Sequence, residues 1–153
     1  MPYSFGLKGD LVGLPTTGGF VGWLSRFAPG LYHRSLSAPF ATFRLPGILS
    51  RLGALERLAL SPEGFTLQHQ KNLTKSLLAR GSKVLTFAFH SPSMQPGQTP
   101  YVRSQEDLKK FLANCRQYFD FFLNEVGGAT MGALELRELL VNPSAANYPH
   151  LTL

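Results

Sequence analysis

The chain has little charge and almost no cysteine, and these shortages exclude several classes of protein. Only 16% of the 153 residues are charged and 44% are hydrophobic, which favours a globular domain over a disordered segment. Cys115 is the only cysteine, so no disulfide can form within the chain. No apolar run approaches the roughly 20 residues of a membrane-spanning helix. The N-terminal residues lack the basic-then-apolar pattern of a secretory signal, so we expect a cytoplasmic protein.

Motifs for common catalytic chemistries are also missing. The chain has no glycine-rich phosphate loop with its lysine and no G-x-S-x-G nucleophile motif. Asp10 is the only acidic residue before Glu56, and no carboxylate stands in an obvious constellation with a histidine. His33, His69 and His150 have no spacing typical of a metal site. The sequence therefore predicts no metal site within this chain.

Basic residues are in excess, but they are dispersed. The chain has 15 Lys and Arg against 9 Asp and Glu, for a formal net charge of +6. Such a charge attracts anionic polymers and membrane surfaces. The basic residues nevertheless stand singly, without a stripe that alternates with stacking aromatics. We therefore expect no nucleic-acid partner, and a basic protein that binds nucleic acid or a membrane surface stays only as a third alternative.

The N-terminal part of the sequence contains one short extended candidate and one helix. Leu11–Thr16 reads as extended, and the Thr16–Gly19 step reads as a loop because paired glycines weaken regular structure. The stretch Gly22–Phe43 is ambiguous because prolines interrupt its apolar positions. Leucines at helical spacing predict a helix over Leu45–Leu58, followed by a turn at Ser61–Gly64.

The second half shows a clearer alternation of elements. A helix is predicted over Leu67–Arg80, with Gly81 suited to end it in the left-handed conformation. A buried strand is predicted next, over Lys83–His90. This order of helix, glycine stop and apolar strand is typical of repeating β/α units.

The longest predicted helix begins after Ser104, a good N-cap, and ends at Gly127-Gly128. Its aromatic residues exceed one face, so most of them belong to the core and part of the cluster can contact other protein: Tyr118, Phe119, Phe121 and Phe122. A last short helix is predicted over Thr130–Val141, and residues 142–153 form a loose tail.

His90 is the strongest candidate for a functional residue. It ends the predicted strand and precedes a loop stiffened by Pro92, Pro96 and Pro100, with Gly97 as its flexible joint. Proteins of the α/β class often display catalytic side chains at such positions. Two interpretations stay open from the position alone, namely a catalytic imidazole and a histidine that caps the strand by hydrogen bonding to the loop.

Two further residues have competing interpretations. Tyr101 is either part of the loop scaffold or an aromatic face that lines a sugar site. Cys115 falls on the apolar face of its helix, which indicates a core residue and not a nucleophile.

Several stretches resemble the C-terminal part of bacterial polysaccharide deacetylases, the nodulation-type family 4 carbohydrate esterases. The likeness is most specific at Phe87–Met94, FAFHSPSM, and at Pro96–Arg103, PGQTPYVR. It extends over about Leu11 to Leu136 and includes these further stretches: Leu14–Gly22, Arg51–Gly64, Leu77–Phe87, Phe121–Thr130 and Leu134–Arg137.

The resemblance implies an α/β fold, namely the C-terminal half of a distorted β/α barrel over residues 1–141. Family members use zinc or another divalent cation, held by one aspartate and two histidines, to activate water against an acetylated sugar. His90 matches the histidine that protonates the leaving amine. The resemblance also implies substrate contacts for Ala88, Ser91 and Tyr101.

The sequence departs from the family where the metal is bound. Nothing in it matches the family's Asp-Asp pair or its His-x-x-x-His motif, so the chain itself is expected to hold no cofactor. We therefore expect a deacetylase fragment that acts on an acetylated polysaccharide or oligosaccharide and is inactive alone. The expected partner is a separately encoded N-terminal half, since a half barrel leaves strand edges unpaired. The alternative is a non-catalytic module that binds glycan or completes a split deacetylase.

Overall fold

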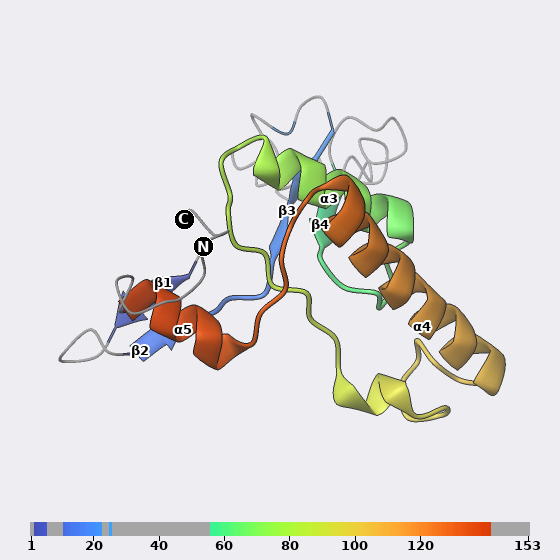
Figure 1. The fold of residues 1–153 in the computed structure, drawn as a ribbon. Coiled ribbons are helices and arrows are strands. Elements are labelled where there is room, and N and C mark those ends of the chain that lie inside the picture. The colour runs from blue at the N-terminus through green and yellow to red at the C-terminus, as the bar shows by residue number, and fades with distance from the viewer. Residues whose placement is uncertain (1, 6–10, 23–24, 26–55, 142–153) are drawn as a thin grey trace, which may run out of the picture.

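The computed structural model describes residues 2–5, 11–22, 25 and 56–141. Figure 1 shows the chain leaving the end of helix α3, descending to the short helix η2 and returning along helix α4. The elements in chain order are β1 (Tyr3–Phe5), β2 (Leu11–Gly13), β3 (Gly18–Val21), β4 (Glu56–Ala59), α3 (Leu67–Leu78), the 3₁₀ helix η2 (Ser91–Met94), α4 (Gln105–Asp120), the π-helical turn η3 (Phe121–Glu125) and α5 (Ala133–Val141).

The strands form two small antiparallel sheets. β1 pairs with β2, with Tyr3 opposite Gly13, and β3 pairs with β4, with Gly18 opposite Ala59. A β/α barrel is instead built from parallel strands that alternate with helices. Within the described residues no barrel is closed, so the expectation of a partial β/α barrel is wrong.

The segment Lys83–His90, predicted to be a strand, lies beside the β3–β4 sheet without joining it as a regular strand. Its Thr86 carbonyl accepts from the Thr17 N–H at 3.4 Å, and its Ala88 N–H donates to the Leu60 carbonyl at 3.2 Å. These bonds go to two different segments of the chain. The segment therefore forms no regular ladder of hydrogen bonds with either of them. Among the described residues, it does not add a parallel strand to the β3–β4 sheet, as a β/α barrel would require.

Two further predictions near this sheet are wrong in part. The predicted helix Leu45–Leu58 lies outside the described residues up to position 55, but Glu56–Ala59 form strand β4. The predicted loop at Thr16–Gly19 gives way to strand β3 from Gly18. A glycine suits position 19 of this strand because α3 packs closely there. A Cβ at this position would lie 3.1 Å from Leu73 Cδ1.

The predicted helices of the second half are confirmed. α3 begins after Thr66, whose hydroxyl accepts from the His69 N–H, and Gly81 follows its end with φ of 83°. α4 begins after Ser104, which forms a reciprocal capping box with Asp107. α5 starts at Ala133, three residues after the predicted start, and the predicted tail lies outside the described residues.

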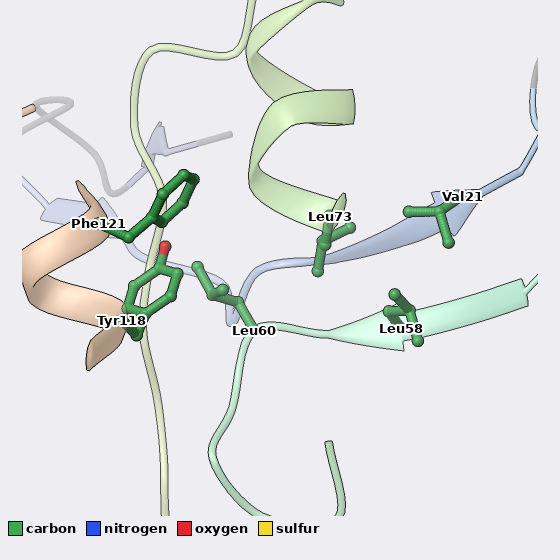
Figure 2. Close-up of a cluster of buried hydrophobic side chains, with 6 residues drawn as sticks. All are labelled: Val21, Leu58, Leu60, Leu73, Tyr118 and Phe121. Carbon is green, nitrogen blue, oxygen red and sulfur yellow. The ribbon is translucent and has the colours of Figure 1, made fainter. Parts of the chain in front are cut away.

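The core joins the β3–β4 sheet to α3 and the end of α4. Figure 2 shows its buried side chains, which are Val21, Leu58, Leu60, Leu73, Tyr118 and Phe121. Tyr118 also places its hydroxyl 3.0 Å from that of Thr74, so the two helices share a buried hydrogen bond. The turn after β4 and the segment after α3 both leave this core, and together they carry the candidate site.

Candidate functional site

The candidate site consists of an exposed imidazole on a buried carboxylate. The side chain of His90 is 77% exposed, whereas that of Glu63 is 5% exposed. Glu63 lies in the turn between β4 and α3, and His90 ends the segment after α3 as the N-cap of η2. The turn and the segment are held together just before the site, because the Ala88 N–H donates to the Leu60 carbonyl.

The carboxylate of Glu63 accepts three hydrogen bonds. His90 donates its main-chain N–H to Oε1 at 3.1 Å, and the His90 Nδ1 lies 2.7 Å from Oε2. The hydroxyl of Ser93, a residue with no exposed surface, donates to Oε1 in a short hydrogen bond. Both oxygens of a nearly buried carboxylate are thus occupied by donors from one loop.

Thr99 extends this hydrogen-bonded chain. The hydroxyls of Ser93 and Thr99 lie 3.0 Å apart. Since Ser93 gives its only hydroxyl proton to Glu63, Thr99 must be the donor in this pair. The loop closes around these contacts, with the Gly97 N–H bonded to the Val102 carbonyl at 2.9 Å and Gly97 at φ of 84°.

The environment keeps Glu63 ionised. Burial alone raises the pKa of this carboxyl. The hydrogen bonds from Ser93 and from the ring and backbone of His90 lower the pKa by more than burial raises it, so the net pKa lies below the ordinary 4.5. An ionised carboxylate only accepts hydrogen bonds, so the proton between it and His90 belongs to Nδ1. Nε2 is then the nitrogen left for external chemistry, and no hydrogen bond among the described residues uses it.

Aromatic packing fixes the segment that leads to His90. The ring of Phe87 stacks on Tyr118 with centroids 4.9 Å apart, and Phe89 meets Phe111 edge to face at 5.4 Å. Both partner residues belong to α4. The imidazole is therefore carried by a segment anchored to the longest described helix.

The other predicted site residues lie around the pair without all converging on it. Ala88 lies two residues before His90 and is half-buried, and Ser91 is exposed at the start of η2. Tyr101 is 49% exposed and borders a separate open hollow of about 320 Å³. The residues that line this hollow are Pro62, Gly64, Tyr101, Asp107, Lys110, Phe111 and Asn114. The hollow thus adjoins both chain neighbours of Glu63 but does not include His90.

The described residues do not fit the metal site that the family resemblance implies. Among them, no three His, Cys, Asp or Glu side chains are grouped so that they could hold a metal ion. His69 instead serves the α3 cap, where its Nδ1 accepts from the Thr66 N–H at 3.3 Å. His33 and His150 lie outside the described residues.

Sequence reasoning missed Glu63 and Ser93, and it assigned Thr99 only to the scaffold of the loop. It treated Glu63 as part of an ordinary Ser-Pro-Glu-Gly turn after a helix, and so found no carboxylate for His90. The structure places a strand, β4, before that turn. The available signal was that Glu63 follows one extended segment, β4, while His90 ends another. This signal could be used only if β4 was assigned correctly.

Comparison of the chain with protein-family models, with curated proteins and with solved structures finds no match. None of the helices in the described ranges has the length and apolar character needed to cross a membrane.

Proposed function

We infer that His90 is a general acid–base residue that acts on an acetylated sugar polymer, with Glu63 as its supporting carboxylate. The observation that carries this proposal is the contact between His90 Nδ1 and Glu63 Oε2 at 2.7 Å, with the rest of the ring exposed. The sugar substrate comes from the resemblance of Phe87–Met94 and Pro96–Arg103 to polysaccharide deacetylases.

The geometry suits proton transfer to a leaving amine. When an acetamide is cleaved, the C–N bond breaks and the amine nitrogen needs a proton. His90, protonated on both ring nitrogens, gives the Nε2 proton to that nitrogen and keeps the Nδ1 proton on Glu63. Glu63 stabilises the charged ring before the transfer and fixes its orientation.

The attack on the acetyl carbonyl requires groups that the described residues do not supply. The family resemblance assigns that step to a divalent cation, and no suitable group of ligands exists in the described part of the chain. We therefore place this chain as one part of a deacetylase, with a separately encoded polypeptide as the source of the metal-binding residues. Alone, the chain is expected to be inactive.

Binding of the substrate is the first test. Addition of an N-acetylhexosamine oligomer should shift the NMR signals of the His90 ring, while the ring of His69, which lies on α3, serves as an internal control. Tyr101→Ala should weaken the effect if the neighbouring hollow holds a sugar ring, whereas Met94→Ala, at another exposed apolar side chain, should not. A His90 ring that ignores saturating oligomer would contradict the proposal.

Turnover is the second test. The chain incubated with zinc and the same oligomer should release no acetate. Acetate release that accompanies stoichiometric zinc binding and disappears in His90→Ala would show that the chain carries its own metal site.

A non-catalytic glycan-binding module is the second candidate function. It is favoured by the lack of a three-ligand group among the described residues. Oligomer binding that is unchanged in His90→Ala, together with no acetate release in any combination, would identify this module in place of an enzyme part.

A further inference from the structure

The segment that carries His90 has one hydrogen-bonding edge that is used and one that is not. On the used edge, Thr86 bonds through its carbonyl and its N–H to Thr17, and Ala88 bonds through its N–H to Leu60. On the other edge, none of the hydrogen bonds among the described residues involves the main chain of Leu85, Phe87 or Phe89.

This division follows from extended geometry. Successive residues of an extended segment direct their N–H and C=O groups to opposite sides. Thr86 and Ala88 therefore face the β3–β4 sheet, and the odd-numbered residues between Lys83 and His90 face away from it. Three consecutive odd positions thus form a short edge with main-chain donors and acceptors still to be paired.

We propose that this edge pairs with the same edge of a second copy of the chain. In an antiparallel pair centred on Phe87, Phe87 lies opposite Phe87 of the second copy, and Leu85 lies opposite Phe89 of the second copy. In an antiparallel ladder, every second pair of opposite residues is a hydrogen-bonded pair, in which the two residues exchange both of their N–H···O bonds. This one register satisfies every unpaired main-chain group of Leu85, Phe87 and Phe89.

The charges of the segment allow two copies to meet. The chain carries a net charge of +6, yet the stretch Val84–Phe89, VLTFAF, has no charged residue, no proline and no glycine. Uncharged stretches with strong β-propensity are typical of strands that pair with the identical segment of another copy of the chain. In this register Lys83 of each copy lies opposite Ser91 of the other copy, so the two Lys83 side chains do not meet.

The side chains point to the same occupant. Phe89 is 41% exposed although its ring already contacts Phe111. In the proposed pair it lies next to Leu85 of the other copy, an apolar residue that is only half-buried in the single chain. The last hydrogen-bonded residue of the pair is Phe89, so the main chain of His90 keeps its bond to Glu63.

Sedimentation velocity over a range of protein concentrations tests the pairing. The unchanged chain should form dimers as concentration rises. Phe89→Lys should raise the dissociation constant by at least about tenfold, because a lysine on an edge resists pairing. Met94→Lys is the matched control, since Met94 is a comparably exposed apolar residue (49%) that lies beyond the paired edge. Circular dichroism should show both variants folded.

Amide hydrogen exchange on the unchanged chain gives an independent readout. The amides of Leu85, Phe87 and Phe89 should become protected as concentration rises, whereas the already bonded amide of Ala88 should not change. A chain that stays monomeric, a dimer that Phe89→Lys leaves intact, or exchange at these amides that does not depend on concentration would each overturn self-pairing. A monomer that instead gains this protection from a different polypeptide would also overturn it.

Discussion

Glu63 is the residue on which the site depends, because a single carboxylate joins two segments of the chain. It belongs to the turn after β4, and all three of its donor groups belong to the loop that begins at His90. A buried carboxylate is stable only when its oxygens are fully hydrogen-bonded. Each donor therefore contributes both to the shape of the loop and to the ionised state of the acid.

Replacing Glu63 with glutamine should destabilise the protein and change its response to acid. One oxygen becomes an amide that cannot accept, so a donor of the loop is left unpaired at a cost of about 2 kcal/mol. Because the pKa of Glu63 is lowered by folding, its ionisation stabilises the fold above the ordinary 4.5, and this contribution is lost as pH falls below that value towards the lower folded pKa.

Urea denaturation at a series of pH values measures this difference. The unchanged chain should lose stability steeply below about pH 4.5, and Glu63→Gln should lose less over the same interval. Glu106→Gln is the control, since Glu106 is an exposed residue that forms a surface ion pair with Lys110 at 3.6 Å. Equal acid slopes in Glu63→Gln and the unchanged chain would contradict the assignment.

Ser93 should act on His90 through Glu63. Ser93→Ala removes one donor from the carboxylate and the acceptor of the Thr99 hydroxyl, which should cost about 1–3 kcal/mol. It should also raise the pKa of Glu63 relative to the unchanged chain, because a hydrogen bond that favours the charged form is lost.

Nitrogen NMR of the His90 ring reports on this coupling directly. The unchanged chain should show the proton held on Nδ1, and Ser93→Ala should shift the population towards the other tautomer. Ser91→Ala, at an exposed neighbouring serine, should leave the ring signals as they are. A ring spectrum that responds equally to both substitutions would mean that Ser93 has only a general structural role.

At the level of elements, the pairing of α3 with α4 holds the site in place. α3 packs on the β3–β4 sheet, and the end of α4 carries the rings on which Phe87 rests. The two helices meet in the buried hydrogen bond between Thr74 and Tyr118. Burial raises the pKa of Tyr118 although this hydrogen bond partly opposes the effect, so the phenol stays protonated and can donate.

Tyr118→Phe should therefore lower the free energy of unfolding by about 1 kcal/mol, because it removes one buried hydrogen bond and keeps the ring. Thr74→Val should have a comparable effect. The double substitution should cost less than the sum, since neither polar group is then left unpaired. Additive effects in a urea denaturation cycle would show that the two hydroxyls do not interact.

Local signals in the sequence were sufficient for α3, α4 and α5. Thr66 and Ser104 cap α3 and α4; a glycine with positive φ, Gly81, follows α3, and another, Gly127, follows the π-helical turn η3 that continues α4. These signals act within a few residues, so a single sequence contains them. The same local reasoning was wrong for Glu56–Leu58, because Leu58, the last leucine of the predicted helical pattern, lies in a strand that pairs with β3.

At the scale of the whole molecule, the sequence predicted a candidate residue, His90, but not the contacts that surround it. His90 was chosen from its place after an apolar segment, and the structure leaves its ring exposed beside a carboxylate. That carboxylate comes from a position 27 residues earlier. Only tertiary contacts such as the one between Ala88 and Leu60 bring the two together, and no periodicity or spacing encodes them.

The barrel expectation was wrong for a related reason. An apolar run between two helices is compatible with a strand in a parallel sheet, with an antiparallel partner, or with an irregular extended segment. The structure has the last of these at Lys83–His90, because its partners, Thr17 and Leu60, belong to different segments. Which neighbours a segment finds is a property of the complete fold.

One detail of the site separates architecture from reactivity. The main-chain amide of His90 reaches Glu63 independently of the imidazole, so the loop is anchored by an atom that every amino acid except proline possesses. Any side chain at position 90 would therefore keep this main-chain bond to Oε1, whereas the bond to Oε2 depends on the imidazole. A different reactive group installed there would keep the main-chain anchor but would also have to supply a new donor to Oε2 of Glu63.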